Sequence, residues 1–190
     1  NYYDVLDRPF FERRAGVTGL LSYPLSRFER LETKVGVAYS EKDKPFENYF
    51  QAGVIATHHV SWIRDTSLWL PVGPIDGQRL HFTLGMTMNL HRPGVENVLF
   101  LGDMRQYFRL GSRSALALRL QGRASGGPDP QVFMLGGTHS LRGYPWRSLH
   151  GRRAAMANAE IRMPLLYGLL LAPAGVGPMV FPGVQGALFM

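Results

Sequence analysis

The sequence predicts an all-β protein: an antiparallel transmembrane β-barrel segment of about eight strands, part of a larger barrel. Three observations predict it. Apolar and polar residues alternate over segments of roughly ten to sixteen residues, no segment has a helical period, and short turns alternate with longer polar loops. Strands of soluble sheets average ~5–6 residues. The period leaves open which face meets water, but the strand lengths and the unequal connections favour apolar faces that meet lipid.

Composition bounds the class of protein. The chain has 190 residues, and 21 lysines and arginines against 14 acidic residues give a net charge of +7. This balance suggests an anionic partner, whether nucleic acid, lipid head groups or acidic polypeptide. The absence of cysteine excludes disulfides and thiolate zinc sites. No apolar run reaches the ~20 residues of a transmembrane helix. No secretory signal is visible at the N-terminus, and the last residues, GVQGALFM, suggest that the chain is a fragment.

The N-terminal third contains three expected strands, justified by alternation. In the second of them Leu31, Val35 and Tyr39 share one face, opposite Arg30 and Lys34. The expected elements in order are a loop over 1–11, a weak strand over 12–23, a turn over 24–27, a strand over 28–40, a charged loop over 41–47, a strand over 48–64 and a Pro/Gly turn over 65–77.

Residues 78–89 alternate most cleanly. Leu80, Phe82, Leu84, Met86 and Met88 share one face, and Arg79, His81, Thr83, Gly85, Thr87 and Asn89 share the other. Further strands are expected up to Leu110, around 116–123, over 154–165 and over 183–190, with a Gly/Pro-rich connection over 166–182.

The longest connection, 125–153, combines glycines, arginines and aromatic residues. Glycine and proline interrupt regular strands, but the bulky residues argue for a loop that packs against other parts of the protein. The strand that follows presents Glu160 and Arg162 on its polar face. A guanidinium group in a partly dry site needs a carboxylate partner. For Arg142 we name Glu160 as the candidate within the chain, because its strand begins where the loop ends. We therefore expect Arg142 to fasten the loop inside the barrel.

The stretch Leu135-Gly-Gly-Thr-His-Ser-Leu-Arg-Gly-Tyr144 resembles the loop signature of the BamA/TamA family of outer-membrane assembly and translocation barrels, the bacterial surface antigen family. The matching positions are Gly136, Gly137, Leu141, Arg142, Gly143 and Tyr144. The segment Glu160-Ile-Arg162-Met-Pro-Leu165 is similar to the next strand of the family, and Asp65, Pro71 and Gly77 resemble its periplasmic turn. The Ser22–Phe28 turn is also similar.

The resemblance implies a bacterial outer-membrane protein that inserts or translocates polypeptides. It implies that residues 1–190 form part of a sixteen-stranded barrel, with loop 125–153 folded into the lumen. Implied partners are outer-membrane lipids, unfolded polypeptide cargo, and barrel and periplasmic parts outside this chain. In the family the loop arginine pairs with an acidic residue of a later strand, beyond Met190.

Other readings are weaker. His58 and His59 point to opposite faces of a strand, so a metal site is not expected, and no cofactor is expected. Gly136-Gly137 lacks the following helix of a phosphate loop. No catalytic constellation appears, so the chain is not expected to be an enzyme. Two alternatives remain: a barrel that anchors or exports a fused catalytic domain, and a soluble basic β-domain that binds nucleic acid. The alternation of Arg119 and Arg123 with leucines favours a lumen wall over a nucleic-acid groove.

Overall fold

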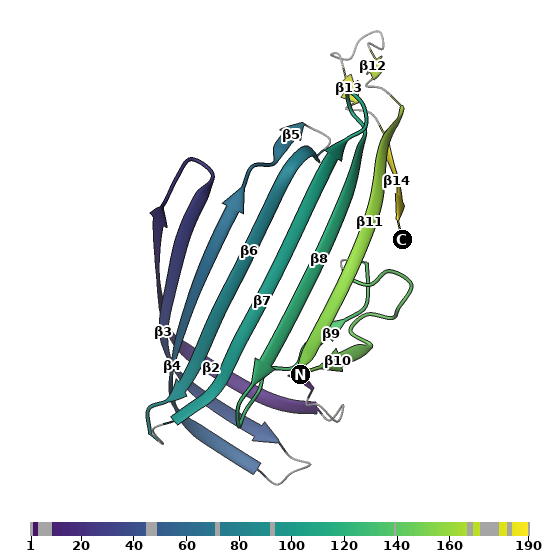
Figure 1. The fold of residues 1–190 in the computed structure, drawn as a ribbon. Helices are drawn as coiled ribbons and strands as arrows, with labels where there is room; N and C mark the ends of the chain where they lie inside the picture. The colour runs from purple at the N-terminus through teal and green to yellow at the C-terminus, as the bar shows by residue number, and fades with distance from the viewer. Residues whose placement is uncertain are drawn as a thin grey trace. The chain divides into compact units, whose positions relative to one another are not determined.

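The fold was obtained as a computed structural model (Figure 1), which describes residues 2–3, 9–44, 49–70, 73–91, 94–138, 140–166, 169–171, 179–181 and 184–189. Within these ranges the chain is all-β. None of the described segments is a helix with the length and hydrophobicity that crossing a membrane requires. The strands are β1 (Tyr2–Tyr3), β2 (Pro9–Pro24), β3 (Glu29–Lys44), β4 (Tyr49–Asp65), β5 (Leu68–Leu70), β6 (Gly73–Asn89), β7 (Gly94–Arg109), β8 (Ala115–Gly126), β9 (Phe133–Leu135), β10 (Leu149–Gly151), β11 (Arg153–Leu166), β12 (Leu169–Leu171), β13 (Met179–Phe181) and β14 (Val184–Phe189).

Most strands belong to one antiparallel sheet with the order β1-β2-β3-β4-β6-β7-β8-β11-β14, and β5 pairs with β6 beside this path. The order follows the chain because tight connections join consecutive strands, as between β2 and β3, where Leu25 N–H donates to the Glu29 carbonyl at 2.9 Å. In the register of β3, Val35 lies opposite His58 on β4 and opposite Gly19 on β2. The pairs β9–β10 and β12–β13 form two small separate hairpins.

The long strands extend further than the sequence pattern indicates. The predicted charged loop over 41–47 is wrong for its first part, because β3 continues through Lys44. The predicted loop over 1–11 is also wrong for its described part, since β2 begins at Pro9 and pairs with β1. At the end of β3 the charged residues 41–44 interrupt the apolar alternation, but their backbones still pair with β4.

Three connections contain short strands that the sequence pattern does not indicate. The turn over 65–77 is a hairpin of β5 with the start of β6, the loop over 125–153 contains β9 and β10, and the connection over 166–182 contains β12 and β13. These segments are rich in glycine and proline, and their strands of three residues are too short to produce a recognisable alternation in the sequence.

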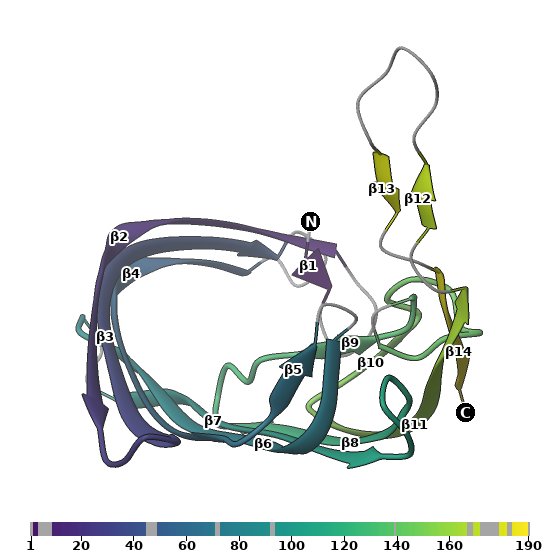
Figure 2. The same ribbon diagram turned by 90° about the horizontal axis from the view of Figure 1, so that it is seen from above.

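The contacts divide the described chain into two compact units. The first contains Asn1–Arg64, Leu80–Asp103 and Gln121–Met156; the second contains Asp65–Arg79, Met104–Leu120 and Ala157–Met190. In the first unit β2, β3 and β4 bend strongly along their length (Figure 2). Its buried apolar residues include Ile55, Ile63, Leu99, Phe133 and Met156. In the second unit Ile75, Tyr107, Ala115 and Ala117 are buried.

The polar face of the first unit is the more buried face. On β6, Thr83 is 7% exposed and Asn89 is 5% exposed, whereas Leu84 on the opposite face is 62% exposed. Gln121 and Ser125 of β8 are buried, while Val98 and Phe100 of β7 are exposed. This distribution is the reverse of the arrangement in a water-soluble sheet, where leucine-type side chains pack inward and polar side chains face solvent.

Pairing among polar residues explains how the polar face tolerates burial. Ser61 and Thr83 hydroxyls lie 2.8 Å apart, and the His81 ring lies 3.2 Å from the Thr83 hydroxyl. Gln121 donates to Asp103 at 3.2 Å and accepts from Arg123 at 3.2 Å. Buried polar groups are stable only when their hydrogen bonds are made, and these contacts within and between strands make them for Thr83 and Gln121. On the opposite face the Trp62 and Phe82 rings stack at 6.0 Å.

Candidate functional site

The connection between β8 and β11 is the candidate site, because it carries the glycine-rich signature and lies on the polar face of the first unit. It is closed at its neck, where the Ser125 N–H donates to the Arg152 carbonyl at 2.9 Å. The Ser125 hydroxyl donates to Asn97 of β7 at 3.1 Å and accepts from the Gln131 N–H at 2.8 Å. One side chain of β8 thus fixes the first turn of the loop to a neighbouring strand.

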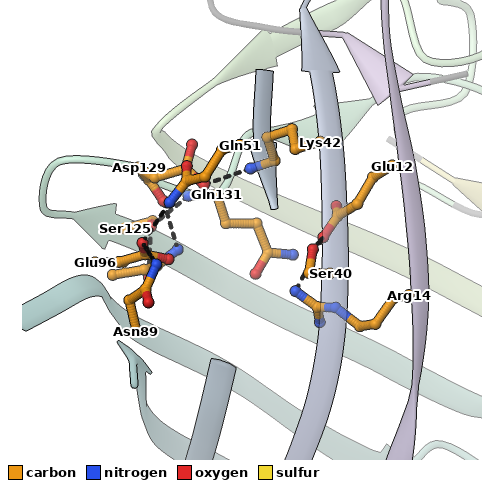
Figure 3. Close-up of polar contacts among 11 residues, drawn as sticks. Glu12, Arg14, Ser40, Lys42, Gln51, Asn89, Glu96, Ser125, Asp129 and Gln131 are labelled. Atoms are coloured by element: carbon orange, nitrogen blue, oxygen red, sulfur yellow. Dashed lines mark hydrogen bonds and ion pairs between the residues drawn. The ribbon is translucent and has the colours of Figure 1, made fainter. Parts of the chain in front are cut away.

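A polar cluster, which we call the base clamp, holds this first turn. It consists of Lys42, Gln51, Asn89, Glu96, Asn97 and Asp129, and Figure 3 labels all of them except Asn97. Lys42 of β3 forms an ion pair with the Asp129 carboxylate, and the two side chains are only 15% and 28% exposed. The Asp129 N–H donates to the Glu96 carbonyl at 3.0 Å, and Asn97 donates to the Asp129 carbonyl at 3.3 Å. Backbone and side chain of Asp129 are therefore both bound.

Glu96 is the centre of the base clamp on the strand side. One oxygen of its carboxylate accepts hydrogen bonds from Gln51 of β4 and from Asn89 of β6, each at 2.8 Å. Hydrogen bonds to an ionised acceptor are stronger than bonds between neutral groups. Gly127 completes the turn with φ +121°, and a Cβ there would lie 2.4 Å from the Glu96 carbonyl oxygen. The loop turn and Glu96 are thus in direct backbone contact.

A second polar group lies on β2 and β3, along the same polar row as Lys42. The Ser40 hydroxyl donates to Glu12 at 2.9 Å, and Arg14 pairs with the same carboxylate at 3.1 Å (Figure 3). These contacts continue the polar row away from the base clamp.

Beyond the clamp the loop forms the β9–β10 hairpin, in which Phe133 pairs with Gly151 and Leu135 with Leu149. Phe133 is buried, and the Arg123 guanidinium of β8 lies 6.0 Å from its ring centroid. An arginine over an aromatic ring forms a favourable cation–π contact. The hairpin is therefore attached to the polar side of β8 as well as to the base clamp.

Gly136 and Gly137 shape the tip of the hairpin, residues 136–148. Their φ angles are +117° and +93°. A Cβ on Gly136 would lie 2.2 Å from the Pro145 carbonyl oxygen, and one on Gly137 would lie 2.8 Å from the Trp146 ring. Gly137 N–H also donates to the Tyr144 carbonyl at 3.1 Å. The glycine pair of the signature thus provides the surface on which the Pro145-Trp146 segment rests.

The remaining signature residues lie at this tip. Arg142 is exposed, and its Nε donates to the Thr138 carbonyl at 3.4 Å. Gly143 has φ +89°, and Tyr144 is half-exposed. Leu141 is partly buried, and its carbonyl accepts from the Tyr144 N–H at 3.4 Å. The structure thus brings Gly136, Gly137, Leu141, Arg142, Gly143 and Tyr144 together in one folded tip.

Glu160 and Arg162 lie on β11, in the second unit. The two side chains form an ion pair with each other at 3.3 Å, and both are part-buried. The Arg162 guanidinium lies close to Gly73 at the start of β6, 3.7 Å from the position of a Cβ there. The pairing of Arg142 with Glu160 stays a prediction.

The turn signature is in the second unit. Asp65 accepts hydrogen bonds from both the N–H and the hydroxyl of Ser67, and Arg79 lies 3.6 Å from its carboxylate. Gly77 has φ +88°, with the Thr66 carbonyl oxygen 2.3 Å from where its Cβ would be. Asp65 and Gly77 therefore shape the hairpin, whereas Pro71 lies outside the described residues.

Sequence reasoning missed the base clamp. Asp129 lies in a Gly/Pro segment without a period, and Lys42 lies in a segment whose charges indicate a loop. One signal was available: Lys42 continues the even-numbered polar row of Lys34 and Ser40 on β3. No group of three or more His, Cys, Asp or Glu side chains suited to a metal ion occurs in the described ranges. No protein-family model and no curated protein matches this chain.

Proposed function

We propose that the chain is part of a bacterial outer-membrane β-barrel of the BamA/TamA type, which inserts or translocates polypeptides. The observation that carries the proposal is the polarity of the sheet: Leu84 is exposed, while Thr83 and Asn89 on the opposite face of the same strand are buried. In a membrane barrel the apolar face meets lipid and the polar face lines the lumen.

Strand length also supports the membrane assignment. The seven long strands have 12 to 17 residues. A tilted strand needs about 9–11 residues to cross the hydrocarbon layer, so each is long enough. In the proposed protein the barrel has sixteen strands and the remaining ones lie outside this chain.

The base clamp and the signature tip support the polypeptide-handling role. A loop held on the polar face by Lys42–Asp129 and by the Phe133–Arg123 contact would lie inside the lumen of such a barrel. Arg142, Gly143 and Tyr144 would then face the aqueous path of a passing polypeptide. The partners of this role are outer-membrane lipids, unfolded polypeptide and the rest of the barrel.

The experiment is reconstitution of the complete protein, encoded by the whole reading frame, into liposomes. The readout is the folding rate of a denatured outer-membrane reporter barrel. We expect folding faster than in empty liposomes by at least about tenfold, equivalent to 1.4 kcal/mol of barrier. Folding at the rate of empty liposomes would contradict the insertion role and would favour the alternative of a barrel that anchors a fused catalytic domain.

Nucleic-acid binding is the less favoured alternative. Arg123 lies over the Phe133 ring and donates to Gln121, which places its charge on the half-buried polar face. A nucleic-acid surface needs arginines that reach phosphates. Recovery of the protein without detergent, together with salt-dependent DNA or RNA binding, would favour this alternative over the membrane role.

A further inference from the structure

The hairpin tip exposes an unusual combination of aromatic and basic side chains. Trp146 is 73% exposed and Tyr144 is 51% exposed, and Arg147, which follows Trp146 in the sequence, is also exposed. Between Asp129 and Glu160 the chain has four arginines and no acidic residue. Exposed tryptophan and arginine are the residues that most often dominate binding surfaces.

The tip is built to hold these side chains in place. The Arg147 guanidinium lies 4.3 Å from the centroid of the Trp146 ring, which is a close cation–π contact. Arg147 also has φ +54°, the left-handed region that non-glycine residues seldom adopt. The Ser148 N–H donates to the Pro145 carbonyl at 3.2 Å and closes the turn around Trp146 and Arg147. Gly136 and Gly137 lie so close to Pro145 and Trp146 that a side chain on either glycine would not fit.

We propose that Tyr144, Trp146 and Arg147 form a binding surface for an acidic, aromatic segment of an extended polypeptide. A carboxylate of such a segment would pair with the Arg147 guanidinium group, and its aromatic side chains would stack on Trp146 and Tyr144. We call these three residues the tip surface.

The place of attachment favours polypeptide over lipid as the anionic partner. The hairpin is fixed to the polar face, through Lys42–Asp129 and through Phe133 beneath Arg123. The exposed apolar side chains that suit lipid, such as Leu84 and Phe100, lie on the other face of the sheet. This step rests on the proposed function, in which the polar face lines an aqueous path.

The test uses the complete protein in detergent and a fluorescent extended peptide that alternates aspartate with tyrosine or phenylalanine. A second peptide carries lysine in place of every aspartate. We expect the acidic peptide alone to bind, with an affinity that falls as salt rises. Trp146→Ala and Arg147→Gln should each weaken binding by about tenfold, since both residues lie at the centre of the tip surface.

Matched controls separate a local effect from loss of fold. Arg13→Gln removes an exposed arginine from β2, and Trp69→Ala removes an exposed tryptophan from β5; both should leave peptide affinity unchanged. Trp146→Phe keeps an aromatic ring and should retain most of the affinity. Circular dichroism checks that each variant keeps its β content.

Three outcomes would overturn the proposal. They are equal binding of the acidic and basic peptides, unchanged affinity in Trp146→Ala and Arg147→Gln, and binding to phosphatidylglycerol vesicles that depends on the same two residues while the peptide does not bind. Reporter folding in liposomes, measured in parallel, separates this proposal from the proposed function. If the protein speeds reporter folding but peptide affinity is the same in Trp146→Ala, only the tip surface is refuted. If peptide binding depends on Trp146 but the protein does not speed reporter folding, only the proposed function is refuted.

Discussion

Lys42 and Asp129 are 87 positions apart in the chain, yet they form the ion pair that fastens the loop to β3. The pair is largely shielded from solvent, so its attraction is screened less than that of a surface pair. Because both side chains are part-buried, losing one charge of the pair should cost more than losing one charge of an exposed ion pair. The first turn of the loop should therefore depend on both residues.

A charge exchange tests the ion pair. Lys42→Asp or Asp129→Lys alone should favour opening of the loop by about 1–3 kcal/mol, the cost of a lost charged hydrogen bond. Trypsin cleavage after Arg142 and Arg147 in the folded protein should then be roughly five- to a hundredfold faster. The double variant should restore much of the protection. Equal protection in all four proteins would show that the pair does not hold the loop.

Gly136 and Gly143 provide a second comparison at the residue scale. Both have positive φ, but a Cβ on Gly136 would meet the Pro145 carbonyl oxygen, whereas a Cβ on Gly143 would meet open space. Gly143→Ala should cost about 1 kcal/mol from backbone strain alone, and Gly136→Ala should cost more because the Pro145 segment must also move. Tryptic cleavage at the tip measures both. Gly126→Ala, with open space and no positive φ, is the control, and an equal effect of all three would contradict the account.

At the scale of elements, β6 shows what alternation predicts and what it does not. The predicted strand over 78–89 is confirmed, and its polar and apolar residues occupy the expected opposite faces. The start of β6 at Gly73 was missed because Pro74, Gly77 and the positive φ of Gly73 interrupt the period. The base clamp was missed for another reason: contacts between distant residues leave no local pattern in a sequence.

Leu84 on β6 gives a prediction that separates a membrane face from a soluble one. Leu84→Arg should destabilise the protein in a bilayer by about 2–4 kcal/mol if the position lies near the midplane, because arginine in hydrocarbon is costly. Urea unfolding of the complete protein in lipid vesicles measures this, with Leu84→Ala as the control for lost side-chain volume. Because Leu84 is 62% exposed, a soluble protein should tolerate arginine there with almost no loss of stability.

For the whole molecule, the all-β antiparallel class followed from periodicity alone, while the assignment of the faces to lipid and water rests on physical argument. Alternation identifies the two faces of each strand but does not determine which face contacts water. Four polar residues of the polar face are buried, while leucines of the opposite face are exposed, which supports the inverted arrangement; the four are Thr83, Asn89, Gln121 and Ser125. The tip residues were found from the sequence because glycine and arginine form a local signature there, whereas the roles of Lys42 and Glu96 emerge only from the fold.

The most direct measurement uses the absence of cysteine from the 190 residues. Single cysteines at Leu84 and at Thr87, a half-buried residue on the polar face of the same strand, are introduced into the complete protein and labelled with an environment-sensitive fluorophore before reconstitution into vesicles. We predict that brominated lipid quenches the label at position 84 and that aqueous iodide quenches the label at position 87. The reverse pattern, or quenching of both labels by iodide alone, would contradict a lipid-facing apolar surface.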